Sequence, residues 1–334
     1  MTGINICKAP IDPDFVRFGE DFGQRFIITI DTEEEFDWTA PLERDNHSLC
    51  SVPAFANFQQ FCEHNGIVPV YLIDYAVANS PQTATVLSEA LANGRAEAGL
   101  HLHPWLNPPF DEDINEFNSF SGNLPEQLER AKFHVLMDAI EQRLGVRPLI
   151  YRAGRYGVGP NSASVLIDEG IAIDTSVRAM FDYSRTGGPN FRDHPLRPYW
   201  LDHDHKLMEL PVTTIFWGPL RPLGRWLYPR LWRTPLLRGV FSRLGLLERI
   251  PLTPEGISAE EAIRAIDVAL DDGLPLLVFS FHSPSLAPGN TPYVRDPKDL
   301  DTFYDWWRQV LGHLQQRNVT PTSVSEILAS VALA

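Results

Sequence analysis

Short apolar runs alternate with amphipathic, helix-like segments along nearly the whole of this 334-residue chain. Apolar runs of about four to eight residues between turn residues are typical of strands buried in a parallel sheet, because helices cover both faces of such a sheet. Strands that alternate with helices predict an α/β fold, and about seven parallel strands favour a distorted (β/α) barrel. The strands are expected at residues 25–31, 67–73, 97–103, 146–152, 171–174, 206–212 and 274–281.

Helix signals fill the intervals between these runs. Ser51 is a candidate N-cap, Ser258 and Glu261 match a capping box, and Gly145 follows the last apolar residue of a long amphipathic stretch. We therefore expect residues 1–334 to form a single domain. Helices are expected at residues 51–66, 80–94, 125–144, 160–169, 258–272 and 297–317, with a last one before the C-terminus.

Two histidines, His101 and His103, lie at the end of one predicted strand, directly before Pro104. If this segment is extended, its side chains alternate in direction, so both imidazoles point to the same side. Neutral imidazole nitrogen is a common ligand for zinc and related ions. The pair therefore predicts half of a metal site, although a single ligand beside an incidental histidine fits the same pattern.

Several other predicted strands also end in chemically active side chains. The carboxyl ends of parallel strands meet at one face of a barrel, where barrel enzymes have their active sites. Polar loops after apolar strands do not explain a selection of His, Asp, Glu and Arg with almost no Lys. We therefore predict a single site at this face. Its further candidates are Asp31, Glu33, Asp74, Arg152, Asp174 and His282.

Asp31 and Glu33 repeat the geometric argument, because residues two apart in an extended segment share a face. One carboxylate could bind a metal ion while the other acts as a base. A site of two histidines and one carboxylate leaves open positions for water and substrate. The acidic run continues with Glu34, Glu35 and Asp37, for which a solvated loop is expected.

His282 follows the most apolar predicted strand and suits the acid that protonates a leaving group, with a hydrogen-bonded structural histidine as the alternative. Arg152 could pair with a base carboxylate and fix its orientation. Arg155 competes for that role, and either arginine could instead form a surface ion pair.

The formal net charge of −15 argues against a general nucleic-acid binder. Three sparse cysteines, Cys7, Cys50 and Cys62, provide no disulfide framework, which favours a reducing, cytoplasmic setting. The first ten residues have no basic stretch before an apolar core, so no secretory signal is expected there. No apolar run is long enough to span a bilayer.

Residues 215–252 differ in character from the rest of the chain. They contain seven arginines among tryptophans, tyrosine and many leucines, and Glu248 is their one acidic residue. This composition suits a membrane interface, where arginines meet anionic headgroups and aromatic rings lie at the boundary. The inserted segment, at about 215–255, is predicted to be helical and to contact the inner membrane surface or a lipid-linked sugar. A helical lid or a dimer contact is the alternative.

Over about residues 25–330 the chain resembles the polysaccharide deacetylase family, the NodB-homology group of metal-dependent carbohydrate esterases. The resemblance implies a distorted (β/α) barrel of seven strands. Thr32 stands where the commonest first motif has a second aspartate, and the two histidines are separated by one residue instead of three. Five motifs in the family's order carry the resemblance, at residues 29–33, 97–104, 151–157, 173–177 and 278–282.

The resemblance implies a hydrolase that removes an N-acetyl group from a saccharide, such as a precursor of a cell-surface polysaccharide. It gives Asp31 the role of base, Arg152 that of steadying the base, and His282 that of acid. It also implies a divalent metal ion, with zinc expected. The remaining implied roles are metal binding by Glu33, His101 and His103, and substrate binding by Asp174 and Trp105.

Three other functions remain open at this point. The same machinery could hydrolyse another amide, such as a cyclic amide or a ureide. The altered first and second motifs also allow a non-catalytic carbohydrate-binding barrel. A glycoside hydrolase with paired carboxylates from residues 31–37 is the weakest reading, because it gives the histidines no task.

Overall fold

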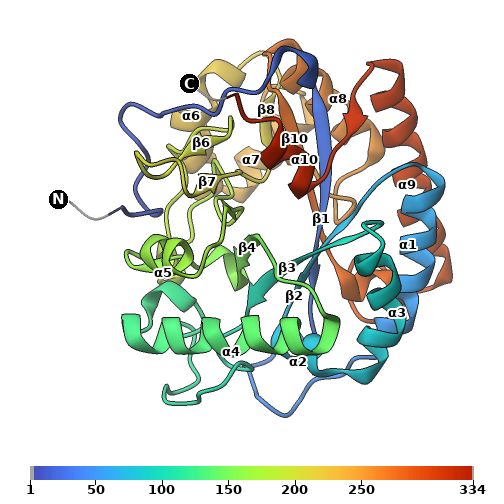
Figure 1. Ribbon diagram of the computed structural model, residues 1–334. Helices are drawn as coiled ribbons and strands as arrows, with labels where there is room; N and C mark the ends of the chain where they lie inside the picture. Colours follow the sequence, from blue (N-terminus) through green and yellow to red (C-terminus); the bar gives the residue numbers. More distant parts are fainter. Residues whose placement is uncertain (1–3, 333–334) are drawn as a thin grey trace.

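The computed structural model describes residues 4–332, apart from the side chain of Pro235. Residues 1–3, which belong to the stretch in which no secretory signal is expected, lie outside the described residues. Its centre is a curled sheet of nine strands (Figure 1). β6 (Tyr199–Trp200) pairs antiparallel with β7, and β11 (Thr320–Pro321) pairs parallel with β1. The expected α/β class and the expected seven parallel strands are confirmed. These seven are β10 (Leu276–His282), β1 (Arg25–Thr32), β2 (Val70–Ile73), β3 (Glu97–Leu102), β4 (Ile150–Ala153), β5 (Ile173–Asp174) and β7 (Met208–Glu209).

The chain that follows β7 bridges the gap between the two ends of the parallel series. The amide of Thr213 donates to the carbonyl oxygen of Val278 in β10 at 3.2 Å, and its hydroxyl accepts from the amide of Val278 at 2.9 Å. The amide of Ser280 donates to the carbonyl of Leu252 at 3.2 Å. Isolated bonds take the place of a regular ladder here, which makes the barrel a distorted one.

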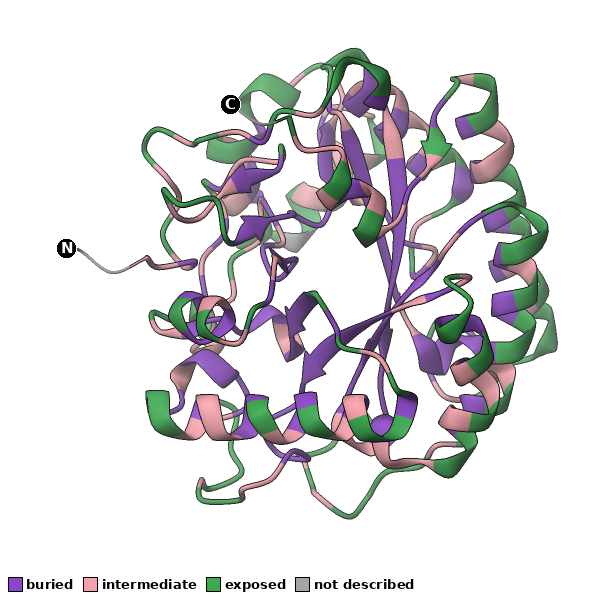
Figure 2. Cartoon of the chain, viewed as in Figure 1, coloured by how far each residue is buried: buried purple, intermediate pink, exposed green. Residues whose placement is uncertain are grey.

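Helices surround the sheet, and Figure 2 shows them with buried faces toward the strands and exposed faces outward. One apolar cluster lies between the helices and the sheet, and a second, which includes Ile27, Leu72 and Val278, fills the inside of the curled sheet. The surrounding helices are α1 (Phe55–His64), α2 (Tyr75–Asn79), α3 (Pro81–Ala92), α4 (Glu126–Leu144), α5 (Ser162–Asp168), α8 (Ala259–Asp271) and α9 (Pro297–Gln316). The last helix, α10 (Val324–Ala329), packs on the inner cluster instead.

Local sequence signals account for several helix ends. Ser258 and Glu261 form the expected capping box of α8, and α4 ends at Gly145, whose φ of 71° suits glycine. The predicted cap at Ser51 is wrong. The Ser51 hydroxyl bonds Glu35 instead, and the chain passes through a short 3-10 turn, Val52–Ala54, before α1 begins.

The inserted segment forms a stem of two strands that carries two helices. β8 (Thr214–Trp217) pairs antiparallel with β9 (Glu248–Pro251), so the chain leaves and returns at one point. Between them lie α6 (Gly224–Trp232) and α7 (Pro235–Arg243), which pack on a small apolar cluster of their own. None of the helices within residues 4–332 is both long and apolar enough to cross a membrane.

Candidate metal centre and active site

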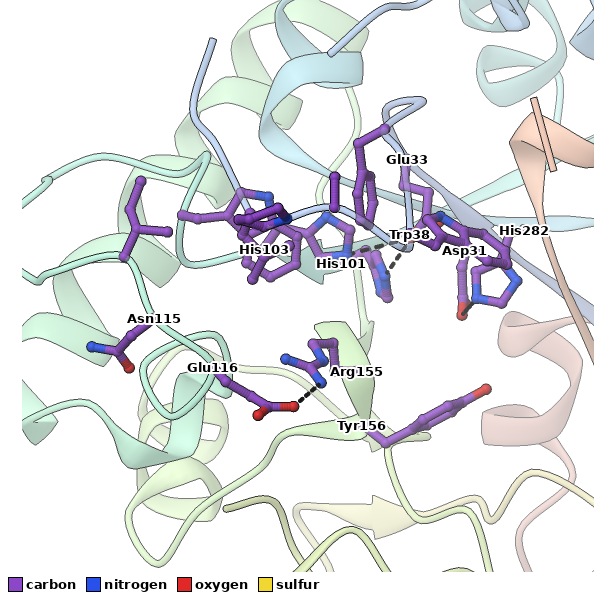
Figure 3. Close-up of a pocket in the computed structure, with 16 residues that line it drawn as sticks. Asp31, Glu33, Trp38, His101, His103, Asn115, Glu116, Arg155, Tyr156 and His282 are labelled. Atoms are coloured by element: carbon purple, nitrogen blue, oxygen red, sulfur yellow. Dashed lines mark hydrogen bonds and ion pairs between the residues drawn. The ribbon is translucent and has the colours of Figure 1, made fainter. Parts of the chain in front are cut away.

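The inner face of the sheet collects the chemically active side chains at the carboxyl ends of four strands. Alternation along β1 puts Asp31 on the same face as Ile27 of the inner apolar cluster, and alternation along β10 does the same for His282 and Val278. His101 of β3 and Arg152 of β4 stand opposite each other in the sheet register. These side chains line or adjoin one cavity (Figure 3).

Glu33, His101 and His103 bring three ligand atoms together. Oε2 of Glu33 lies 3.4 Å from Nε2 of His101 and 3.4 Å from Nε2 of His103. The three donor atoms all lie within 4.8 Å of one another, and the three side chains are buried. Two imidazoles and one carboxylate are a donor set that divalent ions such as zinc accept, with coordination positions left over. The residues therefore fit a metal ion.

Both imidazoles are oriented through their second nitrogen. Nδ1 of His101 lies 3.1 Å from the carbonyl oxygen of Arg152, to which it can only donate. Nδ1 of His103 lies 3.0 Å from the carboxylate of Glu34. A ring that donates through Nδ1 presents Nε2 as the free ligand atom, which is the usual arrangement behind metal-binding histidines.

The electrostatics of this cluster favour a positive charge at its centre. Burial by itself would raise the pKa of Glu33, but His282 and the two neighbouring imidazoles outweigh it and lower the pKa. Burial would lower the pKa of His103, but Glu34 and Glu33 outweigh it and raise the pKa well above its usual range. The buried carboxylates thus demand a cation, which a proton on the imidazole or a metal ion can supply.

Close packing fixes the position of His103, the ligand that lies just beyond the end of β3. Its ring stacks on Trp105 with centroids 4.3 Å apart, and the ring of Phe36 lies perpendicular to it with centroids 6.3 Å apart. Gly154 makes this approach possible, because a Cβ there would lie 2.4 Å from Cδ2 of His103. A side chain at residue 154 would therefore displace the imidazole.

Asp31 and Arg152 form a buried ion pair beside the candidate metal ligands. Burial favours a raised pKa for Asp31, but the Arg152 guanidinium outweighs it, so the pKa is lowered and the carboxylate is ionised. Arg152 also donates to the hydroxyl of Thr29 at 2.8 Å and to the carbonyl of Thr175 at 3.0 Å. Of the two candidate arginines, the structure places Arg152 on Asp31, whereas Arg155 bonds Ser119.

His282 lies on the other side of Asp31, with its Nε2 3.8 Å from Oδ2 of Asp31. Its Nδ1 lies 2.7 Å from Oε2 of Glu255, a residue that the sequence analysis did not single out. Burial opposes protonation of His282, but Glu255 and Glu33 outweigh it and raise its pKa to about 10. The imidazole is therefore protonated at neutral pH, as an acid must be.

Two predictions about carboxylates are wrong. Glu34 and Glu35, expected in a solvated loop, are buried, whereas Asp37 is exposed as expected. Glu34 contacts His103, and Glu35 accepts bonds from the loop at residues 48–51.

The two predicted substrate-binding residues have different places in the structure. Trp105 lines the cavity. Asp174 does not line the cavity, because it stands opposite Tyr151 in the register and points away from the inner face. Its carboxylate is buried on the outer face and accepts a hydrogen bond from the Ser176 hydroxyl at 2.6 Å. Asp74, another candidate, is buried and caps α2, and its second oxygen accepts a bond from the Glu34 amide.

The cavity has a volume of about 480 Å³ and a wall of aromatic rings around the charged centre. Trp38 approaches the His282 ring at 5.0 Å, and Tyr156 lies across the cavity from the ligands (Figure 3). A buried donor set, an ionised carboxylate and a protonated imidazole on one such cavity can together attack a carbonyl carbon with water and protonate a leaving group.

No protein-family model and no curated protein matches this sequence. Solved structures with a similar arrangement include a probable polysaccharide deacetylase from Pseudomonas aeruginosa PAO1, at 12% identity and a TM-score of 0.48 over 93% of this chain and 91% of that one. A family 4 carbohydrate esterase from Streptomyces lividans in complex with acetate has 10% identity and a TM-score of 0.44 over 93% and 97%.

A family 4 acetyl xylan esterase from Clostridium thermocellum in complex with a cobalt ion has 10% identity and a TM-score of 0.43 over 92% of this chain and 91% of that one. The three structures are described as a probable polysaccharide deacetylase, a family 4 carbohydrate esterase and a family 4 acetyl xylan esterase. Identities this low leave the role of each residue here to be argued from this chain's own geometry.

Proposed function

We propose that this protein is a divalent-metal-dependent hydrolase that removes an N-acyl group, such as acetyl, from a saccharide. One observation carries the proposal: three convergent ligand atoms share a cavity with a buried ionised carboxylate and a protonated imidazole. The motif resemblance supports the saccharide, and the aromatic wall of the cavity offers flat apolar surfaces for a ring to lie on.

The metal ion would be held by Glu33, His101 and His103, whose donor atoms converge. A divalent cation there would polarise the amide carbonyl and lower the pKa of a water molecule. Glu34 accepts a hydrogen bond from Nδ1 of His103 and so fixes its tautomer, as the Arg152 carbonyl does for His101.

The protein's own groups move the protons. Asp31, held by Arg152, accepts a proton from water as the water oxygen forms a bond to the carbonyl carbon. His282 donates its proton to the amide nitrogen as the carbon–nitrogen bond breaks, while Glu255 stabilises the imidazolium beforehand. The products are a carboxylate and a free amino sugar.

Metal analysis of the purified protein together with an acetate-release assay tests the proposal. We expect about one divalent ion per chain, release of acetate from N-acetylated saccharides, and loss of both in His101→Ala. His134→Ala is the matched control, because His134 is exposed on α4 and pairs only with Glu169 among the described residues.

Two results would contradict the proposal. Hydrolysis that continues in metal-free protein would remove the metal from the reaction. A metal-loaded protein that hydrolyses no N-acyl saccharide but opens a cyclic amide or a ureide would keep the chemistry and overturn the substrate class.

A further inference from the structure

A second cavity, of about 290 Å³, lies between α6 and the loop at residues 178–192. Five arginines line it, together with aromatic rings and a single acidic residue, Asp182. We call it the arginine pocket; its arginines are Arg178, Arg185, Arg192, Arg233 and Arg249.

Two of these guanidinium groups lie on the same aromatic ring and keep most of their donors free. Arg178 lies 4.0 Å and Arg249 3.5 Å from the centroid of Phe181. Arg178 donates to the Tyr183 hydroxyl, and Arg249 donates to the carbonyl of Met180 at 2.9 Å. The Nε atoms of both arginines are buried and have no hydrogen-bond partner among the described residues.

The positive charge of the pocket is not balanced by nearby acids. Of its five arginines, only Arg192 has an ion-pair partner within residues 4–332, and that partner is Asp182 at 3.6 Å. Burial lowers the pKa of Arg249 to about 10, and Arg178 contributes in the same direction. A planar guanidinium with free donors binds phosphate through two parallel hydrogen bonds, and a phosphate in the pocket would balance its positive charge.

The arginine pocket shares a wall with the catalytic cavity. The guanidinium of Arg178 lies 5.2 Å from the ring of Tyr156, which lines the catalytic cavity. The same ring stacks on Tyr183 of the arginine pocket, with centroids 5.8 Å apart. The two cavities are therefore neighbours, with the ring of Tyr156 between them.

We propose that the arginine pocket binds a phosphate or pyrophosphate group attached to the acylated saccharide, a proposal that rests on the function proposed above. The substrate class then becomes a phosphorylated N-acyl sugar. The phosphate is either that of a free sugar phosphate or that of a sugar linked to a lipid, because both present the same oxygens to the arginines.

Titration calorimetry with inorganic pyrophosphate tests the pocket without catalysis. We expect binding by the unmodified protein and affinity lower by about tenfold or more in Arg249→Gln, because hydrogen bonds to charged groups are lost. Arg243→Gln, which removes the same charge from an exposed position outside the pocket, should bind normally. Should Arg249→Gln unfold, Arg185→Gln removes an exposed arginine of the same pocket. Equal affinity in all variants would overturn the proposal.

Kinetics connect the pocket to the substrate. For an N-acetyl sugar phosphate, Arg249→Gln should raise KM about tenfold with little change in kcat, whereas KM for the uncharged N-acetyl sugar should change much less. Comparing the soluble phosphate with the same sugar on a polyprenyl pyrophosphate in vesicles identifies the source. An unchanged KM for both refutes the pocket's role, whereas pyrophosphate binding without any deacetylation refutes the proposed function instead.

The outer surface of the two inserted helices carries a separate observation. Within residues 4–332, thirteen large apolar side chains are exposed, and seven of them lie between residues 223 and 244. Leu236, Leu237 and Val240 of α7, together with Leu244 at its end, form one stripe at the spacing of helical turns. We call this the α6–α7 surface; its apolar members are Leu223, Trp226, Trp232, Leu236, Leu237, Val240 and Leu244.

Charge identifies what this surface fits. Residues 215–252 carry seven arginines and one acid, whereas the rest of the chain has 21 basic and 42 acidic residues. Arg230 and Arg238 lie over the rings of Trp226 and Trp232, so cations and apolar groups share the surface. We infer that the α6–α7 surface docks on a membrane that contains anionic phospholipids.

Flotation with vesicles tests this second inference. The protein should float with vesicles that contain phosphatidylglycerol, but not with pure phosphatidylcholine, and Leu236→Ser with Leu237→Ser should abolish flotation. Phe117→Ser, at an exposed apolar residue outside the surface, is the control. Absence of flotation at low salt would refute membrane docking. A dimer of the unmodified protein that is monomeric in the double variant would also refute it.

Discussion

The active site and the α6–α7 segment differ in charge and in how the chain holds them. The candidate active site consists of acids and imidazoles, most of them buried, and the register of β1, β3, β4 and β10 sets the positions of those on the strands. The α6–α7 segment consists of arginines and exposed apolar groups on two short helices, joined to the barrel through the stem of β8 and β9.

This difference suits the two regions to different functions, catalysis and surface recognition. Chemistry needs donor atoms held to within fractions of an ångström, and buried side chains between strands provide that precision. Recognition of a charged surface tolerates looser placement, because long-range attraction and apolar burial do not depend on one geometry. We therefore expect substitutions at the strand ends to change turnover, and substitutions on α7 to change association alone.

Asp31→Asn gives the strictest test of the catalytic side and the largest expected effect. Hydrolysis should fall by roughly 10²–10⁴-fold, because the amide cannot accept the proton of water. Metal content should stay near that of the unmodified protein, as measured by elemental analysis. Asp37→Asn, which changes an exposed carboxylate in the loop that follows β1, is the control. Turnover retained in Asp31→Asn would remove this residue from the role of base.

Glu34→Gln tests whether a residue without a predicted metal contact still tunes the site. We expect metal affinity to fall by about 10–100-fold, because the imidazole of His103 loses its charged partner. Competition with a chelator measures the affinity. Glu35→Gln is the matched control, since Glu35 is also buried but bonds the loop at residues 48–51. Equal losses in both variants would mean that loop order, and not the imidazole contact, sets the affinity.

Glu255→Gln should change the pH dependence of hydrolysis. Activity needs a protonated His282 and falls as pH rises through its pKa, which is raised to about 10 largely by Glu255. Without this carboxylate the pKa falls, so the alkaline limb of kcat should move to lower pH by about one unit or more. A pH–rate profile measures the shift. An unmoved limb would mean that another group is the acid.

Leu236→Ser should have the smallest effect and tests the other side of the comparison. The side chain of Leu236 is 88% exposed, so the free energy of unfolding should change by less than about 0.5 kcal/mol. Chemical denaturation and acetate release should both match the unmodified protein. A clear loss of stability would mean that this residue packs against the barrel.

Much of the barrel could be predicted from the sequence, because the apolar runs and their turn residues are local signals. The capping box at Ser258 and the glycine after α4 determined helix ends in the same way. The inserted segment was predicted to be helical, but its stem was not, because β8 and β9 pair across 30 residues of intervening chain.

At the site, alternation along the strands placed Asp31, His101 and His282 on one cavity. Alternation also explains why Asp174 does not line the cavity. Thr175, the residue after β5, points to the inner face and bonds Arg152, so Asp174 points to the other face. Glu255 could not be found by this logic, because it lies in a loop and reaches His282 only through the tertiary fold. The burial of Glu34 likewise depends on contacts with distant residues.

The stem of β8 and β9 has an evolutionary consequence. Thr214 and Pro251 lie opposite each other, so the intervening chain begins and ends at neighbouring backbone positions. A hairpin turn of a few residues could join these two positions without changing the strand order of the nine-stranded sheet. The segment that provides Arg249 and the α6–α7 surface could therefore be exchanged while the strands that carry Asp31, His101 and His282 keep their pairing.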